Sequence, residues 1–317
     1  MKSWKTTLTL ACAAFILAGS TAYGDKYFWH DGAGGAQAWS NDDPDTGYWF
    51  DGSGGPPANR VSQPTSSDQA IIEANCCLDA DEICASFTVK QNVDLYLDDR
   101  AATPVGKTLQ LAGSTVTSSI ESGAVVHLVD DTSKLEFSDT SSTIHTISDS
   151  GTIDGEDDAA AITITSANKT FTLAGTAAIT GNLTIDGAGS FTNQGRVEAD
   201  NSGTLKLAMT GTLDDSTGTN RWKATKANAI LKFDSTIGSV GGGSLQGEFV
   251  ISVAPTAEIE VNEALTNLHR LRMENGLLDV NANLAMGSGT LFMDLTDDAA
   301  SGSPTIDVAP DAMFTHN

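Results

Sequence analysis

The stretch GSFTNQGRVEADNSGTLKL, residues 189–207, shows the pattern that decides the fold of this chain. Short runs at Ser190–Thr192, Arg196–Ala199 and Thr204–Leu207 alternate apolar and polar side chains. Alternation with a period of two is typical of strands that bury one face, and the Asn-Gln-Gly and Asn-Ser-Gly steps between the runs consist of turn residues. The stretch therefore predicts three short strands joined by tight corners.

The same pattern extends outward over most of the chain after residue 70. No proline occurs between Pro104 and Pro255, which suits continuous hydrogen bonding on both sides of each strand. The best helical window, residues 265–273, is brief. Further strands are predicted at 70–73, 86–89, 94–97, 108–111, 125–129, 134–137, 162–165, 170–173, 182–185, 229–233, 248–251, 258–261, 277–280, 290–293 and 305–308.

Two weak internal repeats accompany these strands. Residues 107–113 (KTLQLAG) are similar to residues 169–175 (KTFTLAG), and 202–207 are similar to 288–293. We interpret the offset of the first pair as three coils of about 20 residues, a period typical of solenoids. The fold class is therefore all-β. A parallel β-helix over residues 71–317 and tandem β-sandwiches both remain open, and the irregular strand spacing favours the β-helix.

The charge of the chain narrows the range of partners. The formal net charge is -24 and the pI is about 4.2. Nucleic acid is not an expected partner, because binding to phosphates needs clustered Lys and Arg. An acidic surface can attract divalent cations.

The pattern of residues 1–24 predicts a secretory signal peptide. Lys2 and Lys5 precede an apolar run at residues 8–18, and small residues near Gly24 offer cleavage sites. Removing this segment takes away two of the 17 basic residues and none of the 41 acidic ones, so the mature charge is 15 − 41 = −26. No later apolar run is long enough for a membrane anchor, so we expect a secreted or cell-surface protein.

Residues 25–70 form a Trp-, Gly- and Pro-rich segment. Residues 28–35 (FWHDGAGG) recur as residues 48–55 (YWFDGSGG). One hypothesis is that Trp29, Trp39, Tyr48 and Trp49 stack against sugars and bind extracellular glycans or cell-surface components. The alternative, which we favour, is an apolar cap on the first coil, because solenoids need atypical terminal repeats.

These residues carry a resemblance to known proteins. Trp29, Trp39-Ser40-Asn41, Trp49, Pro64 and residues 68–72 (DQAII) are similar to the opening of large secreted bacterial β-helix proteins. Residues 191–205 resemble the coils of autotransporter passengers and hemagglutinin-type adhesins. The resemblance implies a right-handed parallel β-helix and an extracellular or cell-surface role. It transfers no catalytic residue. From the whole chain we predict a structural or adhesive function without catalytic activity.

Acidic residues supply the candidate metal ligands. The densest cluster is Asp154, Glu156, Asp157 and Asp158, and calcium, which takes six to eight oxygen ligands, is the candidate cofactor. The alternative is that these acids occupy turns, where Asp is favoured. The five histidines appear isolated, without a second His or Glu at metal-ligand spacing.

An enzymatic alternative remains open beside the structural one. Some polysaccharide lyases use this fold, with calcium on acidic residues and a Lys or Arg as the base. The candidate bases are Lys134, Lys169, Arg196 and Lys206, each more simply a solvent-facing strand residue. A basic group around Trp222 is expected to be a loop that packs through its Trp over the coil.

Cysteines add one structural expectation. Export permits disulfides, and a bridge from Cys76 or Cys77 to Cys84 would close a short loop. The third thiol would be left over, and no CxxC zinc spacing is present.

Overall fold

The computed structural model describes most of the chain after residue 63. It covers residues 64–100, 105–113, 117–138, 144–215, 221–237, 248–251, 256–293 and 304–316. It also describes the backbone of five short strands, namely β1 (Lys26–Trp29), β2 (Gln37–Ala38), β3 (Trp49–Asp51), β4 (Asn59–Arg60) and β24 (Ser239–Val240). Every regular element in these parts of the chain is a β-strand.

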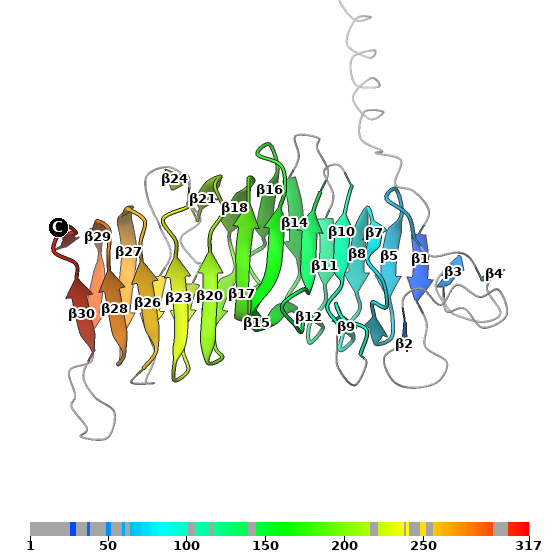
Figure 1. Ribbon diagram of the computed structural model, residues 1–317, viewed down its shortest axis with the longest axis horizontal. Coiled ribbons are helices and arrows are strands. Elements are labelled where there is room, and N and C mark those ends of the chain that lie inside the picture. The colour runs from blue at the N-terminus through cyan, green and yellow to red at the C-terminus, as the bar shows by residue number, and fades with distance from the viewer. Residues whose placement is uncertain are drawn as a thin grey trace, which may run out of the picture.

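The strands stack in parallel rows on three faces of a solenoid (Figure 1). Face 1 consists of β5 (Gln69–Ile72), β8 (Ser86–Val89), β11 (Thr117–Ile120), β14 (Ile144–Ser148), β16 (Thr170–Leu173), β18 (Ser190–Asn193), β21 (Thr212–Asp214) and β24. Face 2 consists of β6 (Cys76–Cys77), β9 (Asp94–Tyr96), β12 (Val125–Leu128), the first halves of β15 (Thr152–Ile164) and β17 (Ala178–Gly187), β19 (Arg196–Ala199), β22 (Arg221–Ala224) and β25 (Glu248–Ile251).

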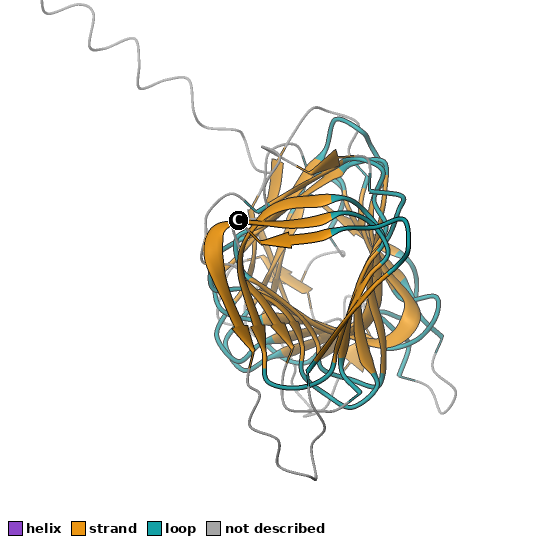
Figure 2. Ribbon diagram, turned by 90° about the vertical axis from the view of Figure 1, so that its left-hand side faces the viewer, coloured by secondary structure: helices purple, strands orange, loops and turns teal. Residues whose placement is uncertain are grey.

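Face 3 completes each coil. It consists of β7 (Glu82–Cys84), β10 (Thr108–Leu111), β13 (Lys134–Phe137), the second halves of β15 and β17, β20 (Gly203–Leu207), β23 (Ala229–Phe233), β26 (Glu258–Val261), β28 (Leu277–Val280) and β30 (Thr305–Val308). Near the C-terminus, β27 (Leu265–Met273) and β29 (Leu284–Met293) each run around one corner, and β31 (Phe314–His316) pairs with the start of β29. Seen along its long axis, the chain winds around a single interior (Figure 2).

The parallel register shows that the coils differ in length. Gln69 lies opposite Ser86 on the next coil, whereas Thr88 lies opposite Ser119, a step along the chain that is nearly twice as long. The strands keep similar lengths along each face, so this variation is taken up mainly by the corners. No single repeat period therefore describes the chain.

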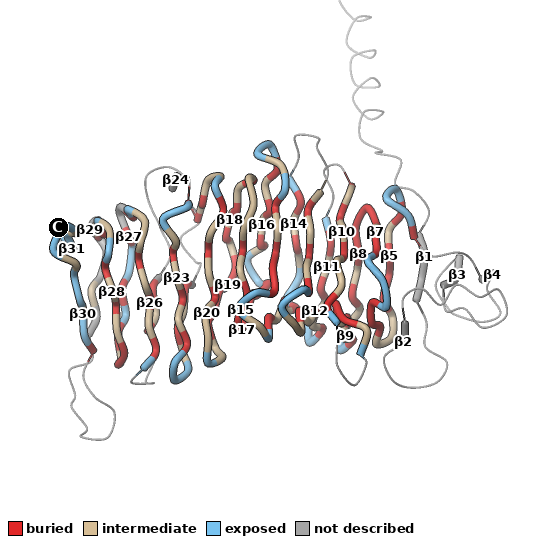
Figure 3. The backbone as a smooth tube through the Cα atoms, in the orientation of Figure 1, coloured by how far each residue is buried: buried red, intermediate tan, exposed pale blue. Residues whose placement is uncertain are grey.

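Buried residues recur along the strands of the solenoid (Figure 3), and the apolar ones from all three faces form one contiguous core column. Strands such as β10, β12 and β13 alternate half-exposed and buried residues, as period-two alternation predicts. Six aromatic rings stack from coil to coil, with neighbouring centroids 4.7 to 6.4 Å apart. In order they are Phe137, Phe171, Phe191, Trp222, Phe233 and Phe249, all of them fully buried.

The parallel β-solenoid predicted from the sequence is confirmed, and the tandem β-sandwich alternative is wrong. Sandwiches are built from antiparallel hairpins, but strand pairing here is parallel from β5 to β31. The 265–273 window, with its faint helical period, is strand β27. Strands β15 and β17 are also longer than expected, because each bends around a corner from face 2 to face 3.

The internal repeats do not mark equivalent places in the solenoid, which corrects the expectation from the sequence. The strand in the first copy of KTLQLAG is β10 on face 3, whereas the strand in the second copy is β16 on face 1. The second repeat likewise matches β20 on face 3 with the latter half of β29. The offset between the two copies is therefore not a whole number of coils. Every face needs the same alternation followed by a corner, so similar sequences serve different faces.

The aromatic N-terminal segment extends face 1 at its first end. Strand β1 pairs in parallel with β5 and antiparallel with β3, so that Trp29 and Trp49 lie opposite each other in the backbone register. Strand β4 continues the antiparallel part. The side chains of Trp29, Trp39, Tyr48 and Trp49 lie outside the described residues, so their glycan-binding or capping role stays a prediction.

The predicted disulfide does not form in the structure. Cys76, Cys77 and Cys84 are free thiols, and all three are buried. Cys76 and Cys84 belong to the apolar core, where a thiol packs as a small hydrophobic group. Burial raises the pKa of the Cys77 thiol to about 11 and raises that of Cys84 further still.

Candidate functional site

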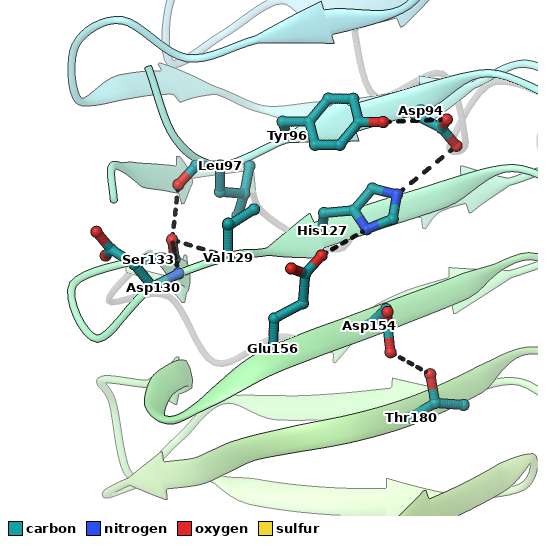
Figure 4. Close-up of polar contacts among 10 residues, drawn as sticks. All are labelled: Asp94, Tyr96, Leu97, His127, Val129, Asp130, Ser133, Asp154, Glu156 and Thr180. Atoms are coloured by element: carbon teal, nitrogen blue, oxygen red, sulfur yellow. Dashed lines mark hydrogen bonds and ion pairs between the residues drawn. The ribbon is translucent and has the colours of Figure 1, made fainter. Parts of the chain in front are cut away.

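A histidine on face 2 lies at the centre of the most distinctive polar cluster. In β12, Val126 and Leu128 point into the core, so the alternation places His127 on the outer surface. The parallel register sets His127 opposite Tyr96 in β9 on one side and opposite Asp154 in β15 on the other (Figure 4). Three successive coils thus bring their side chains together at this point.

Carboxylates approach both ring nitrogens of His127. Its Nε2 lies 3.8 Å from Oδ1 of Asp94, and its Nδ1 lies 3.3 Å from Oε1 of Glu156 (Figure 4). The Glu156 contact does not meet hydrogen-bond geometry, and Nδ1 is a buried atom without a hydrogen-bond partner. The imidazole is therefore held between acids, and one of its nitrogens is left unsatisfied.

The ring plane of His127 is fixed by stacking. The rings of Tyr96 and His127 have centroids 4.6 Å apart and planes inclined by 8°. The Arg100 guanidinium carbon lies 4.1 Å from the Tyr96 centroid. The Tyr96 hydroxyl donates a hydrogen bond of 3.3 Å to Oδ2 of Asp94. These contacts hold both the histidine and its neighbouring carboxylate in position.

On the other side of His127, Asp154 is oriented by the next coil. The hydroxyl of Thr180 donates a 2.7 Å hydrogen bond to Oδ1 of Asp154 (Figure 4). His127, Asp154 and Glu156 each offer one ligand atom, and these atoms lie within 4.8 Å of one another. A nitrogen and two carboxylate oxygens at this spacing form a candidate metal-ligand set.

The electrostatics of this cluster are set by its acids. In the described parts of the chain, no Lys or Arg forms an ion pair with Asp94, Asp154 or Glu156. Burial and then the charge of Asp154 raise the pKa of the nearby Asp200 carboxyl. On the same face, by contrast, Glu198 lies 3.0 Å from Arg196 and 3.7 Å from Lys223. The negative charge around His127 is therefore a local feature of face 2.

The structure divides the acidic group that the sequence marked as a metal site. Asp154 and Glu156 lie in the cluster around His127. Asp157 accepts a 2.9 Å hydrogen bond from the backbone of Ala159, and Asp158 accepts one of 2.8 Å from the backbone of Thr204. These two acids lie where the register of β15 shifts between Glu156 and Ala161, and they stabilise that corner.

The expectation that every histidine is isolated is wrong for His127. The acids grouped with it, Asp154 and Glu156, lie on the next coil, at the far end of a long step along the chain. Local ligand motifs have spacings of a few residues, so they do not detect a site built across coils. Only the number of residues in this coil would have shown that His127 lies beside Asp154 and Glu156, and the sequence does not show that number.

The candidate lyase bases are engaged or buried. Lys206 lies 2.9 Å from Asp234, and Lys134 lies 3.9 Å from Glu136. Arg196 pairs with Glu198. Lys169 was expected to face solvent, but it is fully buried, and its Nζ donates to the backbone oxygen of Gly113 at 3.3 Å.

The basic group around Trp222 forms a strand instead of the expected loop. Its residues lie in β22, and the Trp222 side chain points into the core, because it occupies an inward position of the alternation. Lys223 points outward on the same strand and lies near Glu198. This segment therefore belongs to the aromatic stack and to face 2, and it presents no separate basic patch.

An open hollow of about 350 Å³ lies at the corner that follows face 1. It is lined by Gln91, Glu121, Ser122, Asp149 and Ser150. Lys90 lies 2.8 Å from Glu121, and the Ser119 hydroxyl donates to Asp149. Glu121 of this hollow thus has a lysine partner, whereas Asp94, Asp154 and Glu156 around His127 form no ion pair with a Lys or Arg of the described residues.

Comparisons with known proteins define no family for this chain. No family model, no curated protein and no solved structure matches it. Among the described residues, no helix has the length and apolar character needed to cross a membrane. A proposal for the function therefore rests on the fold and on the polar cluster around His127 on face 2.

Proposed function

We propose that this chain is an exported, acidic β-solenoid with a structural or adhesive role, of the type found in autotransporter passengers and hemagglutinin-like adhesins. The surface that contacts a partner would be the long lateral face of the solenoid. The observation that carries this proposal is the uninterrupted stacking of parallel coils on three faces around one apolar column. Such a column suits a stiff rod that presents side chains at regular intervals.

The contacts on the outer faces support a structural or adhesive role. Ion pairs link neighbouring coils, as between Lys206 and Asp234 at 2.9 Å and between Lys232 and Glu260 at 2.8 Å. Each such surface pair adds at most about 1 kcal/mol to the free energy of unfolding. These pairs therefore shape the charge pattern of the surface more than they stabilise the rod. An extended face of this kind suits a polymeric or repetitive partner better than a small molecule enclosed in a pocket.

Export is supported by the sequence of residues 1–24, with its basic start, apolar run and small residues near Gly24. The enzymatic alternative, a calcium-dependent polysaccharide lyase, needs a Lys or Arg free to act as a base beside acids. In the described parts of the chain, the four candidate bases are paired with carboxylates or buried. This favours the non-catalytic role.

The test measures binding and cleavage on the same protein. The purified chain is applied to a glycan array and incubated with acidic polysaccharides, with calcium and with a chelator. Binding without cleavage supports an adhesin, and absence of both with a folded β spectrum supports a structural rod. Calcium-dependent depolymerisation would overturn the proposal. Cell fractionation with N-terminal sequencing tests export independently, and an intact N-terminus in the cytoplasm would contradict it.

If glycans bind, matched variants locate the surface. Trp29→Ala and Trp49→Ala remove the paired aromatic residues of the N-terminal segment. Lys232→Ala changes face 3 far from that segment and serves as the control. Loss of binding in the two tryptophan variants alone would place recognition at the N-terminal end, whereas loss in the lysine variant would place it on the lateral face.

A further inference from the structure

We propose that His127, Asp154 and Glu156 bind a divalent transition-metal ion of the zinc class, with Asp94 and Thr180 as supporting residues. This site is distinct from the calcium site that the acidic stretch suggested, because it draws on two coils and includes a nitrogen ligand. It does not depend on the adhesive role proposed above.

The chemistry of the ligand set suits a zinc-class ion. Zinc accepts imidazole nitrogen and carboxylate oxygen, with bonds of about 2 Å, and commonly keeps an open position for water. Calcium takes oxygen ligands, usually six to eight of them. A set of one imidazole and two carboxylates therefore fits a zinc-class ion better than calcium.

The spacing of the ligand atoms is close to that around a single ion. Two ligands each about 2 Å from one ion are at most about 4 Å apart. The three ligand atoms already lie within 4.8 Å of one another. Closing onto an ion requires only small side-chain movements, and Glu156, the most exposed of the three, has the freedom to make them.

The imidazole of His127 has a ring nitrogen without a hydrogen-bond partner. Asp94 lies on the Nε2 side and favours a proton on that nitrogen, which leaves a lone pair on Nδ1, the nitrogen 3.3 Å from Oε1 of Glu156. Nδ1 is buried and accepts no hydrogen bond, although a buried polar atom normally has a partner. A carboxylate behind a histidine ligand is the usual outer support of a zinc site. Thr180 gives the same support to Asp154.

The charge around His127 also favours a cation. Asp154 and Glu156 each bring a carboxylate oxygen into the ligand set with His127, Asp94 lies on the other side of the imidazole, and none of these acids has a Lys or Arg partner among the described residues. Like charges at this distance repel, and a divalent cation would relieve that repulsion. The ion would also join β12 to β15 across two coils, so its binding should stabilise the fold.

The experiment measures metal binding by the chelator-treated full-length chain, under reducing conditions, with Zn²⁺ alone and with Ca²⁺ alone. Isothermal titration against a competing chelator gives stoichiometry and affinity. We expect one equivalent of Zn²⁺ to bind and to raise the unfolding temperature. His127→Gln should abolish this event, and Asp94→Asn should weaken it about 10- to 100-fold, as for other changes behind a ligating histidine.

The matched control is His269→Gln, which removes an exposed histidine from β27 and should leave zinc affinity unchanged. Glu156→Gln changes a half-exposed side chain and should also weaken zinc binding, and circular dichroism verifies that each variant is folded. The ¹⁵N resonances of histidine should show Zn²⁺ on Nδ1 of His127. Equal zinc binding by His127→Gln and the wild type would overturn the proposal. So would absence of zinc binding, or binding of calcium alone.

Discussion

Trp222 donates a 2.8 Å hydrogen bond from its indole Nε1 to Oδ2 of Asp215, and both side chains are completely buried inside the solenoid. Trp222 is the largest of the fully buried side chains and stands between Phe191 and Phe233 in the aromatic stack. The carboxylate allows an indole N–H to occupy an otherwise apolar column, since an unpaired buried donor is costly.

Replacing Asp215 should therefore destabilise the fold. Asp215→Ala leaves the Trp222 N–H without this acceptor, and we expect a loss of about 1–3 kcal/mol in the free energy of unfolding. Urea denaturation measures it. Asp215→Asn keeps an acceptor and should lose less than Asp215→Ala. If both variants were as stable as the wild type, the hydrogen bond would not contribute to stability.

Two glycines in the same coil of the solenoid, Gly175 at the corner after β16 and Gly181 in β17, should respond differently to alanine. Gly181 has a φ of +81°, and a Cβ there would lie 1.9 Å from the backbone oxygen of Gly155 on the neighbouring coil. Gly181→Ala should lower the stability by more than about 1 kcal/mol. Gly175 has no such strain, and its nearest neighbour to a Cβ is 3.4 Å away, so Gly175→Ala should be neutral within about 0.5 kcal/mol. Thermal unfolding compares the pair, and equal losses would contradict the backbone argument.

His145 should make the fold sensitive to acid. Its side chain is fully buried, with Nε2 2.9 Å from the Ser118 hydroxyl, and burial together with the charge of Lys169 lowers its pKa to about 3. Between pH 6.5 and about 3 the unfolded chain binds a proton here that the folded chain does not. Stability contributed by this residue is therefore lost as the pH falls, by up to about 1.4 kcal/mol per pH unit.

The comparison that isolates this effect uses two histidine variants. His145→Gln should show a shallower decline of stability between pH 7 and 4 than the wild type, whereas His269→Gln, at an exposed site, should follow the wild type. Urea denaturation at each pH supplies the profiles. Parallel profiles for His145→Gln and the wild type would show that His145 titrates normally in the folded state.

The three thiols should be protected from alkylation. Cys76, Cys77 and Cys84 are buried, and burial raises the pKa of all three. Since the thiolate is the reactive form, iodoacetamide should label these residues only after denaturation. Peptide mass spectrometry without prior reduction gives the labelling of each cysteine. A disulfide-linked peptide containing Cys84 would contradict the free thiols seen here.

Much of the architecture could be predicted from local sequence. The alternation in residues 189–207 predicted strands that the structure has as β18, β19 and β20, with closely similar ends. Period-two alternation is a local property, because adjacent side chains point to opposite faces of a strand. The parallel stacking followed from many short strands, turn residues and the scarcity of proline.

Only part of the candidate site could be predicted from the sequence. Asp154 and Glu156 stood out as acids, but so did Asp157 and Asp158, and nothing local separated the two pairs. The separation arises because β15 follows face 2 as far as Glu156 and then bends toward face 3. His127 could not be assigned to the site from the sequence, because Asp154 and Glu156 lie one full coil further along the chain.

The sequence by itself determined which residues point inward and which outward on the strands it predicted, and it favoured a solenoid over β-sandwiches. Only the tertiary structure decided which outward residues become neighbours. The physical reason is that corners vary in length, so that the step from Thr88 to Ser119 is nearly twice that from Gln69 to Ser86. Register between coils is set by three-dimensional packing of the core, and that register places His127 beside Asp154 and Glu156.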